Sequence, residues 1–403
     1  MLSRAEALEL VLAKAPALRT EVVPLMSALG RISASALLSS NDLPPFDNSA
    51  MDGYAARSFD IASASPTNPV FLKVIGKIAA GQSFSGSIQQ MESVRIFTGS
   101  MLPQGADCVV MQEDTAPPNE QDSTVGVTSS CAKWENIRFK GEDVRIGASL
   151  VGAGERLNAG SQALLAACGI GVISVFKKPR VALLSTGAEL VAPGNPLPPG
   201  KIYESNQVML SGLLNSIGIH PTLLSSVSDL GGDLQASIKQ ALDQHDVLIT
   251  TGGVSVGEFD LVKSSFQKIG GKLELWRISI KPGKPFAFGT LGDRQLFGLP
   301  GNPVSAFVTF LLMCRPALLK MQGAVDFELP SQVCELTTEV ENRGDRAHFM
   351  RMCIDNSGMV SPAGTQASHI LNTLGKTNGL LEVPPRSRLA RGARVKVLRI
   401  GSD

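Results

Sequence analysis

The stretch DVLITTGGVSVGEFD, residues 246–260, begins as a strand and ends as a loop of small and acidic residues. Its apolar start, VLI, is typical of a strand covered on both faces. Glycines let backbone N–H groups approach an anion closely, and hydroxyl groups can donate to the same anion. The residues with these properties are Thr250, Thr251, Gly252, Gly253 and Ser255.

Two carboxylates, Glu258 and Asp260, close this loop. Mg²⁺ prefers oxygen ligands and commonly bridges a protein carboxylate and a substrate phosphate. The loop therefore predicts a site for phosphate and a cation, and the alternative is a surface turn with solvated acids. The G-x-x-x-x-G-K-[ST] pattern of nucleotide-binding P-loops and the G-x-G-x-x-G pattern of dinucleotide-binding folds are both absent from it.

Two further apolar runs end in small-residue loops: RVALLSTGAEL, residues 180–190, and RQLFGLPGNPVSAF, residues 294–307. Helical segments lie between or after these runs. This alternation predicts a parallel α/β sheet with helices on both faces. Ligands of such sheets bind outside the carboxyl ends of the strands, so we expect the three loops to meet at one edge.

The loops that follow the other two apolar runs are weaker indications of a phosphate site. In STGAEL, Thr186 and Gly187 can line a phosphate beside Glu189, although a helix cap with an acid in its first turn explains the same residues. The turn made by Pro300, Gly301, Asn302 and Pro303 precedes a long apolar helix. Asn302 suits a cap and Pro303 the first helical position, while the free N–H groups there also suit an anion.

The stretch SIKPGKPFAFG, residues 279–289, presents Lys281 and Lys284 on either side of Pro-Gly. Prolines restrain the turn, so two ammonium groups are held at a short spacing. Such a pair suits a dianion or a tetrahedral oxyanion. A solvated basic turn is the alternative.

Composition narrows the class of protein. The net charge of the 403 residues is +1, which gives no bulk attraction to nucleic acid or membrane. None of the six cysteines forms a C-x-x-C pair or lies at zinc spacing from a histidine. The acidic N-terminal stretch is unlike a signal peptide, and the apolar run VSAFVTFLLM is shorter than the roughly 20 residues that span a bilayer. We therefore expect a cytoplasmic protein.

The flanking regions differ from the central one. Residues 1–40 have a helical pattern, residues 70–150 form short alternating runs separated by glycine and proline, and the last 80 residues return to short strands. PPFDNSAMDGYA, residues 44–55, and FTGSMLPQGADCVVMQED, residues 97–114, carry Asp47, Asp52 and Glu113, which are candidates for metal or polar contacts. Asp52-Gly53 and Pro103-Gln104-Gly105 are typical of turns, so we interpret these stretches first as structural. The basic C-terminal segment RSRLARGARVKVLR favours a strand with a charged face over a polyanion site.

Taken together, PPFDNSAMDGYA, FTGSMLPQGADCVVMQED, STGAEL, TTGGVSVGEFD, IKPGKPFAFG and LPGNPVSAF resemble, in order and spacing, the molybdopterin molybdenumtransferase family. That family includes bacterial MoeA and the gephyrin E domain. The resemblance implies insertion of molybdate into adenylylated molybdopterin, with Mg²⁺ and release of AMP. Ala188 stands where a common form has an acid, but Glu189 is present.

The resemblance also implies an elongated homodimer of four-domain chains with its cleft between subunits. The expected fold combines a three-layer α/β domain like that of MogA with a mixed N-terminal, an inserted β-rich and a C-terminal barrel-like domain. The expected boundaries are 1–52 with 141–176, 53–140, 177–323 and 324–403. Expected partners are the molybdopterin adenylyltransferase and the apo-molybdoenzymes that receive the cofactor.

Carried over residue by residue, the resemblance implies a set of catalytic positions: Asp52, Thr98, Glu189, Asp229, Asp260, Lys281 and Lys284. Of these, Glu189, Asp229 and Asp260 would place the cation, and the lysines would hold molybdate. Arg351 and Ser368 join the loop residues as substrate-binding candidates. Two alternatives stay open: an adenylyltransferase-like enzyme, which would lack the flanking domains, and a non-catalytic cofactor-binding scaffold. Tungstate is nearly isosteric with molybdate and cannot be separated from it by sequence.

Overall fold

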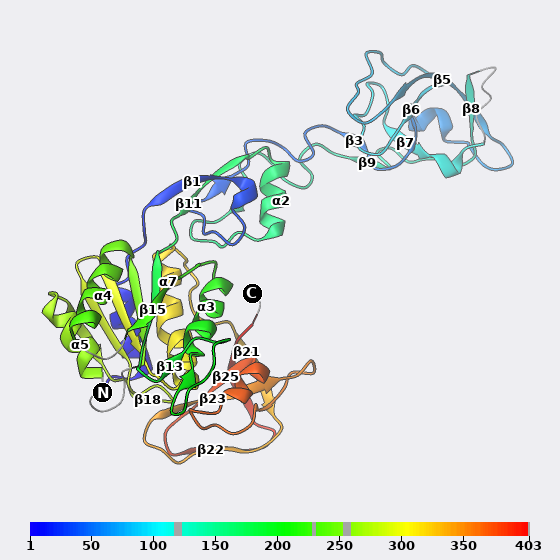
Figure 1. Cartoon of the computed structure of the whole chain (residues 1–403). Coiled ribbons are helices and arrows are strands. Elements are labelled where there is room, and N and C mark those ends of the chain that lie inside the picture. Colours follow the sequence, from blue (N-terminus) through cyan, green and yellow to red (C-terminus); the bar gives the residue numbers. More distant parts are fainter. Residues whose placement is uncertain (117–122, 228–230, 253–258, 402–403) are drawn as a thin grey trace.

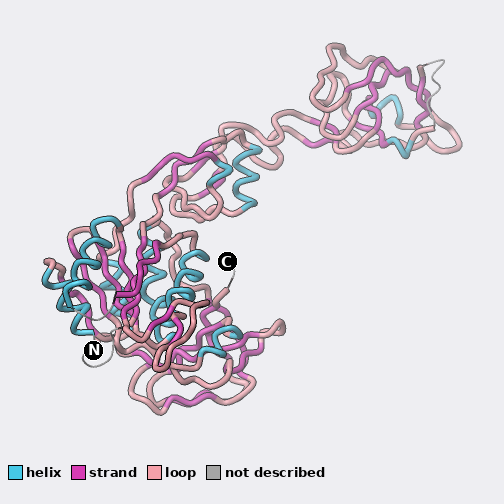
Figure 2. The backbone as a smooth tube through the Cα atoms, viewed as in Figure 1, coloured by secondary structure: helices cyan, strands magenta, loops and turns pink. Residues whose placement is uncertain are grey.

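The computed structural model describes residues 1–116, 123–227, 231–252 and 259–401. The chain is elongated (Figure 1). An α/β domain and a C-terminal barrel lie at one end, a small mixed domain follows, and an inserted β domain occupies the far end. Figure 2 shows that helices concentrate in the α/β domain, while strands and loops dominate elsewhere.

The α/β domain is built on a six-stranded sheet of order β15-β12-β16-β20-β19-β17. Its parallel strands are β12 (Val181–Thr186), β15 (Thr222–Val227), β16 (Val247–Thr251) and β20 (Arg294–Leu299). The strand β19 (Ala287–Leu291) runs antiparallel to β20, and β17 (Lys272–Trp276) pairs with β19 at the edge. The parallel sheet predicted from the three apolar runs is confirmed.

Each face of this sheet has its own core. Along β12, Val181 and Leu183 belong to one cluster, whereas Ala182 and Leu184 belong to the other, because successive side chains point to opposite faces. The first cluster takes in α1 (Arg4–Ala13), α3 (Asn206–Ser216), α6 (Pro303–Thr309) and α7 (Arg315–Met321). The second takes in α4 (Gly231–Gln244) and α5 (Phe259–Lys268). The result is a three-layer sandwich.

The run Pro303–Met321 is continuous, with a π-helical turn at Phe310–Cys314 between α6 and α7. By length and composition this run could cross a membrane, but 94% of it is buried inside the protein. It is the central helix of the first core, which explains its uniformly apolar sequence.

The N-terminal region differs from the helical expectation in two ways. First, α1 packs in the α/β core instead of with the rest of residues 1–52. Second, residues Thr20–Pro24 form β1, which pairs antiparallel with β11 (Val172–Phe176). The helical prediction beyond residue 13 was wrong because the β-branched pair Val22-Val23 favours an extended chain and its pairing partner is distant in sequence. The strands β2 (Leu37–Leu38) and β10 (Ser149–Val151) and the helix α2 (Ala159–Ala167) complete this domain.

The inserted domain is a five-stranded sheet of order β7-β4-β6-β5-β8. Its strands are β4 (Gly53–Ala56), β5 (Val70–Ile78), β6 (Glu92–Ile96), β7 (Cys108–Met111) and β8 (Thr124–Val127). The chain enters and leaves it through β3 (Asn48–Ser49) and β9 (Ile137–Arg138), which pair antiparallel at the neck seen in Figure 1.

The C-terminal domain is a closed barrel, as expected. Its strands are β21 (Ser331–Leu336), β23 (Ala347–Ile354), β24 (Met359–Pro362), β25 (Gly379–Val383) and β27 (Arg394–Arg399). Closure follows because β23 pairs with both β24 and β25. A short strand of the α/β region, β18 (Ile280–Lys281), runs parallel to β23 and ties the two domains together.

Asp246, which directly precedes β16, stabilises the amino edge of the central sheet by linking β16 to the amino ends of β12 and β20. Its carboxylate, 16% exposed, accepts hydrogen bonds from the backbone N of Arg180 at 2.9 Å and from Arg180 Nη2 at 3.0 Å, and it also pairs with Arg294. Burial opposes ionisation, but these hydrogen bonds and charges prevail and hold the pKa of Asp246 below its ordinary value.

We expect Asp246→Asn to lower the free energy of unfolding by about 1–2 kcal/mol at neutral pH, measured by calorimetry. Because its pKa is lower in the folded than in the unfolded state, the carboxylate stabilises the fold above an unfolded pKa of about 3.9 and loses this effect as pH falls through the folded-state pKa. The difference between the two proteins should therefore shrink below about pH 4. Asp243→Asn, which removes an exposed pair with Lys239, is the control and should change little.

Candidate functional site

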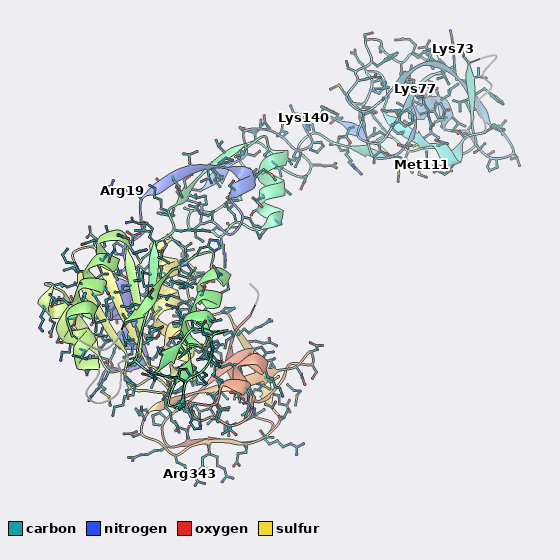
Figure 3. All side chains as sticks on the ribbon, viewed as in Figure 1. Arg19, Lys73, Lys77, Met111, Lys140 and Arg343 are labelled. Atoms are coloured by element: carbon teal, nitrogen blue, oxygen red, sulfur yellow. The ribbon has the colours of Figure 1, made fainter. Side chains whose placement is uncertain are left out.

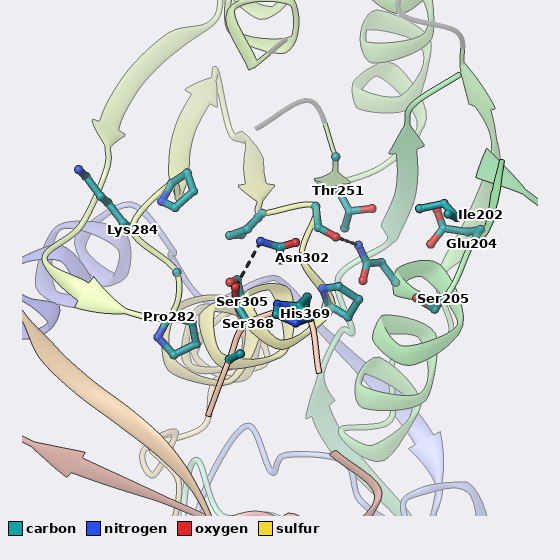
Figure 4. A pocket seen from close by; sticks show the side chains of 18 of the residues that line it. Ile202, Glu204, Ser205, Thr251, Pro282, Lys284, Asn302, Ser305, Ser368 and His369 are labelled. Atoms are coloured by element: carbon teal, nitrogen blue, oxygen red, sulfur yellow. Dashed lines mark hydrogen bonds between the residues drawn. The ribbon is translucent and has the colours of Figure 1, made fainter. Parts of the chain in front are cut away.

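A cleft of about 1140 Å³ lies at the carboxyl edge of the parallel strands. It brings together loops that are far apart in the sequence, and the barrel supplies one of its walls (Figure 4). The predicted residues that line it are Thr186, Glu189, Gly252, Lys281, Lys284, Pro300, Gly301, Asn302, Pro303 and Ser368. The expectation that the three loops meet at one edge is confirmed.

A side-chain contact and a close backbone approach set the floor of the cleft. Ser185 Oγ lies 3.1 Å from Thr251 Oγ1, which joins the ends of β12 and β16. Gly252 follows with φ +88°, and a Cβ there would lie 2.1 Å from the carbonyl oxygen of Thr186. Only glycine fits at this position, because any side chain would collide with a neighbouring backbone. The glycine therefore allows the two strand ends to meet under the ligand.

Glu189 presents a free carboxylate. It is exposed in the cleft and makes no hydrogen bond or ion pair with the described part of the chain. Its two oxygens fold back over Gly187, where a Cβ would come within 2.7 Å of each. Gly187 thus leaves room for the carboxylate, and an unpaired carboxylate of this kind fits a hard cation such as Mg²⁺.

The LPGNP turn is fixed by side chains on two neighbouring elements. Asn206, at the start of α3, donates from Nδ2 to the carbonyl oxygen of Gly301 at 2.7 Å. Asn302 donates from Nδ2 to Ser368 Oγ at 3.4 Å and makes no side-chain cap to α6. Asn302 thus occupies the N-cap position of α6, as predicted, but its side chain reaches across to the barrel loop instead of capping the helix. Pro303 does occupy the first helical positions, as predicted.

The opposite wall is cationic. Lys281 lies on β18 and Lys284 follows it, and Arg346, which sequence reasoning missed, lines the same wall and donates from Nη1 to the carbonyl oxygen of Ile280 at 2.8 Å. Burial, together with the charges of Lys281, Arg351 and Arg346, lowers the pKa of neighbouring His348 to about 4. The histidine is therefore neutral at pH 7, and the positive charge of this wall comes from Lys281, Lys284 and Arg346, of which Arg346 also pairs with Asp345.

Arg351 does not line the cleft. It is fully buried in the barrel, where Nη2 donates to the carbonyl oxygens of Thr365 and Ala367. Its position supports the segment that carries Ser368 and His369 into the cleft. Arg351 as a residue that binds substrate directly stays a prediction.

Asp52 and Thr98 lie close together but far from this cleft. Asp52 Oδ1 accepts from the backbone N and Oγ1 of Thr98, at 2.8 and 2.9 Å. These hydrogen bonds lower the pKa of Asp52. Both residues belong to the inserted domain, at the other end of the chain (Figure 1). One chain therefore does not bring them to its own lysines.

Some predicted residues cannot be placed. Asp229, Gly253, Ser255 and Glu258 lie outside the described residues. Asp260 lies in α5, but its side chain is not described. Within the described ranges no group of three or more His, Cys, Asp or Glu side chains is arranged to hold a metal ion. The three-carboxylate set of Glu189, Asp229 and Asp260 stays a prediction.

Glu204 is a further cleft residue that sequence reasoning missed. The sequence offered only an acid shortly before a helix, in IYESNQVMLSG, and such an acid is typical of a cap. Figure 4 shows Glu204 and Lys284 on opposite sides of the cleft. The cleft is thus polarised, with cations on one side and a buried acid on the other.

The fold and this cleft define a class: a multidomain protein whose α/β domain carries a polar cleft with two lysines and a free carboxylate at the carboxyl edge of its parallel strands. Three family models match the chain: the MoeA N-terminal region (domain I and II) over residues 2–169, a probable molybdopterin binding domain over 182–320, and the MoeA C-terminal region (domain IV) over 334–400. The chain belongs to the MoeA family.

Individual relatives support the same family assignment. The chain is 38% identical to the molybdopterin molybdenumtransferase of Haemophilus influenzae, over 89% of this chain and 88% of that one. It is 34% identical to the Bacillus subtilis protein of the same name, over 95% and 90%. The crystal structure of a molybdopterin biosynthesis MoeA protein from Pyrococcus horikoshii superposes with a TM-score of 0.82 at 33% identity, covering 100% of both chains.

Proposed function

We propose that this protein is a molybdopterin molybdenumtransferase, which inserts molybdate into adenylylated molybdopterin and releases AMP. The observation that carries the proposal is the single cleft in which glycine loops, a free carboxylate and two lysines meet. A substrate with a pyrophosphate and an incoming molybdate presents several anionic groups. The glycine loops with the carboxylate suit the pyrophosphate and its cation, and the lysines suit molybdate.

In this proposal the residues of the cleft position and neutralise the substrate. Backbone N–H groups at Gly252 and Gly301 line the pyrophosphate, where glycine permits a close approach. Lys281 and Lys284 hold molybdate near the dithiolene, and no cysteine is needed because the sulfurs belong to the pterin. Glu189 would hold Mg²⁺ with Asp229 and Asp260. A bound Mg²⁺ would act as a Lewis acid at phosphorus and stabilise the leaving AMP.

We further propose a homodimer, in which the inserted domain of one chain completes the cleft of the other. Asp52 and Thr98 of one chain would then lie at the cleft of the partner chain, because the cleft of their own chain is at the opposite end of the molecule. The adenylyltransferase that supplies the substrate and the apo-molybdoenzymes that receive the product are the proposed partners, in the cytoplasm.

The test of the function is a direct assay. The purified protein is given adenylylated molybdopterin, Mg²⁺ and molybdate, and AMP release is followed together with activation of an apo-molybdoenzyme. We expect both signals to depend on molybdate. Tight binding without AMP release would instead identify a carrier or scaffold, and formation of adenylylated product from ATP would identify an adenylyltransferase.

The cation assignment has its own prediction. Asp260→Ala should abolish Mg²⁺-dependent AMP release while the circular dichroism spectrum and the melting temperature stay near those of the wild type. The reason is that a carboxylate next to the ligand loop contributes to the charge of the site more than to the core. AMP release is titrated with Mg²⁺ in both proteins, and an unchanged titration would contradict the assignment.

A further inference from the structure

The carboxylate of Glu204 is the most deeply buried acid of the cleft that the structure describes. The residue is 7% exposed, yet it lines the cleft. One oxygen, Oε1, accepts from the backbone N of Gln207 at 2.9 Å, in the first turn of α3. Within the described residues the other oxygen has no hydrogen-bond partner, and no Lys, Arg or His forms an ion pair with the carboxylate.

Capping of α3 uses only one of the two carboxylate oxygens of Glu204. Burying an ionised group is costly unless hydrogen bonds or an opposite charge compensate it. A cap alone would be served as well by an exposed acid at the same position. The second oxygen of Glu204 is not one of the fully buried unpaired side-chain atoms, so it is open to the cleft, where it can accept from donors that arrive with a ligand.

An apolar wall lies beside this carboxylate. The strands β13 (Leu190–Val191) and β14 (Ile202–Tyr203) form a two-stranded parallel ribbon. Its residues Leu190, Ile202 and Tyr203 line the cleft, and Ile202 and Tyr203 stay 56% and 46% exposed. Figure 4 shows Ile202 next to Glu204, across the cleft from Lys284. Exposed apolar side chains next to an acceptor suit a flat heteroaromatic ring with N–H groups on its edge.

We propose that Glu204 recognises the aminopyrimidinone edge of the pterin, with the β13–β14 ribbon covering the ring. This deepens the proposed function and rests on it. The pterin edge presents two adjacent donors, the 2-amino group and N3–H, and a carboxylate offers two acceptors to such a pair. The corresponding edge of adenine places an acceptor beside its amino group, so it cannot satisfy both oxygens. Glu204 would thus orient the substrate with its pterin at the acidic end and its anions toward the lysines.

The test uses two fluorescent probes, pterin-6-carboxylate and lumazine-6-carboxylate, titrated into the full-length protein without molybdate. They differ in a 2-amino group against a 2-oxo group, with the accompanying proton on N1 of lumazine. We expect the wild type to bind the pterin about tenfold more tightly or better, because the oxo group of lumazine would face the carboxylate. In Glu204→Gln the side-chain carbonyl can still cap α3 while its amide N–H₂ faces the ring, so the preference should disappear or reverse.

Glu189→Gln is the matched control, because it makes the same change to another carboxylate of the cleft. It should keep the preference for pterin. If Glu204 only caps α3, Glu204→Gln would lower the melting temperature or weaken both probes equally, and the ratio of their affinities would not change. That result would overturn the inference.

Two other outcomes would also overturn it. If Glu204 instead accepts from the ribose diol, the probe ratio stays unchanged and Glu204→Gln loses discrimination between AMP and 2′-deoxy-AMP. If it holds the cation, the Mg²⁺ requirement of AMP release shifts with no change in the probe ratio. A wild type that inserts molybdate yet binds both probes equally refutes the inference alone. A wild type without molybdate-dependent AMP release refutes the proposed function.

Discussion

Lys281→Gln is expected to lower kcat/KM for molybdate by about 10²-fold. Lys281 lies on the cationic wall and forms no ion pair within the described residues, so its charge is available to an incoming oxyanion. Glutamine keeps much of the length and hydrogen-bonding capacity of the side chain but loses the charge. AMP release measured over a range of molybdate concentrations gives the effect.

Binding of adenylylated molybdopterin should change much less in this variant, because the glycine loops and the acidic end of the cleft are intact. Lys272→Gln is the control: this lysine is on the edge strand β17, is 73% exposed and pairs with Glu274. Equal losses in molybdate use and in pterin binding by Lys281→Gln would count against a separate oxyanion position.

Two inactive variants should restore each other when mixed. Asp52→Ala alters the inserted domain and Lys281→Gln alters the α/β cleft, and each alone should lose most of its activity. If each cleft takes its Asp52 from the partner, a mixed dimer carries one cleft with both changes and one with neither. Random exchange of subunits gives about half mixed dimers, so about a quarter of the native activity should return.

The control mixes Glu189→Ala with Lys281→Gln, which both alter the same cleft and should not restore activity. The proteins are mixed under conditions that exchange subunits, and sedimentation shows whether dimers form. Failure of Asp52→Ala and Lys281→Gln to complement within proven mixed dimers would contradict a cleft shared between chains.

The edge of the parallel sheet could be predicted from sequence because its determinants are local. Apolar runs ending in glycine loops identify β12, β16 and β20, and the carboxyl ends of parallel strands must lie together. For the same reason Thr186, Gly252 and Asn302 were expected at one cleft, and they do line it.

What the sequence could not predict depends on contacts between distant segments. The strand β1 was missed because its partner β11 lies about 150 residues away, and the β-branched pair Val22-Val23 alone is too short a signal to predict a strand. The amide of Asn302 reaches Ser368 instead of capping α6, which only the docking of the barrel on the α/β domain determines. Glu204 escaped notice because burial, not residue type, distinguishes it from an ordinary cap.

The paired strands β3 and β9 form a narrow connection between the inserted domain and the rest of the chain. Both passages of the chain run through one narrow ribbon, and the Asp52–Thr98 pair lies beyond it. Figure 3 places Lys140 near this ribbon and Lys73, Lys77 and Met111 on the domain past it. Because the domain extends far from this ribbon, a small rotation at the ribbon would displace the far end of the domain by a larger distance. In the proposed dimer, such a rotation would open or close the shared cleft without any rearrangement of the sheet.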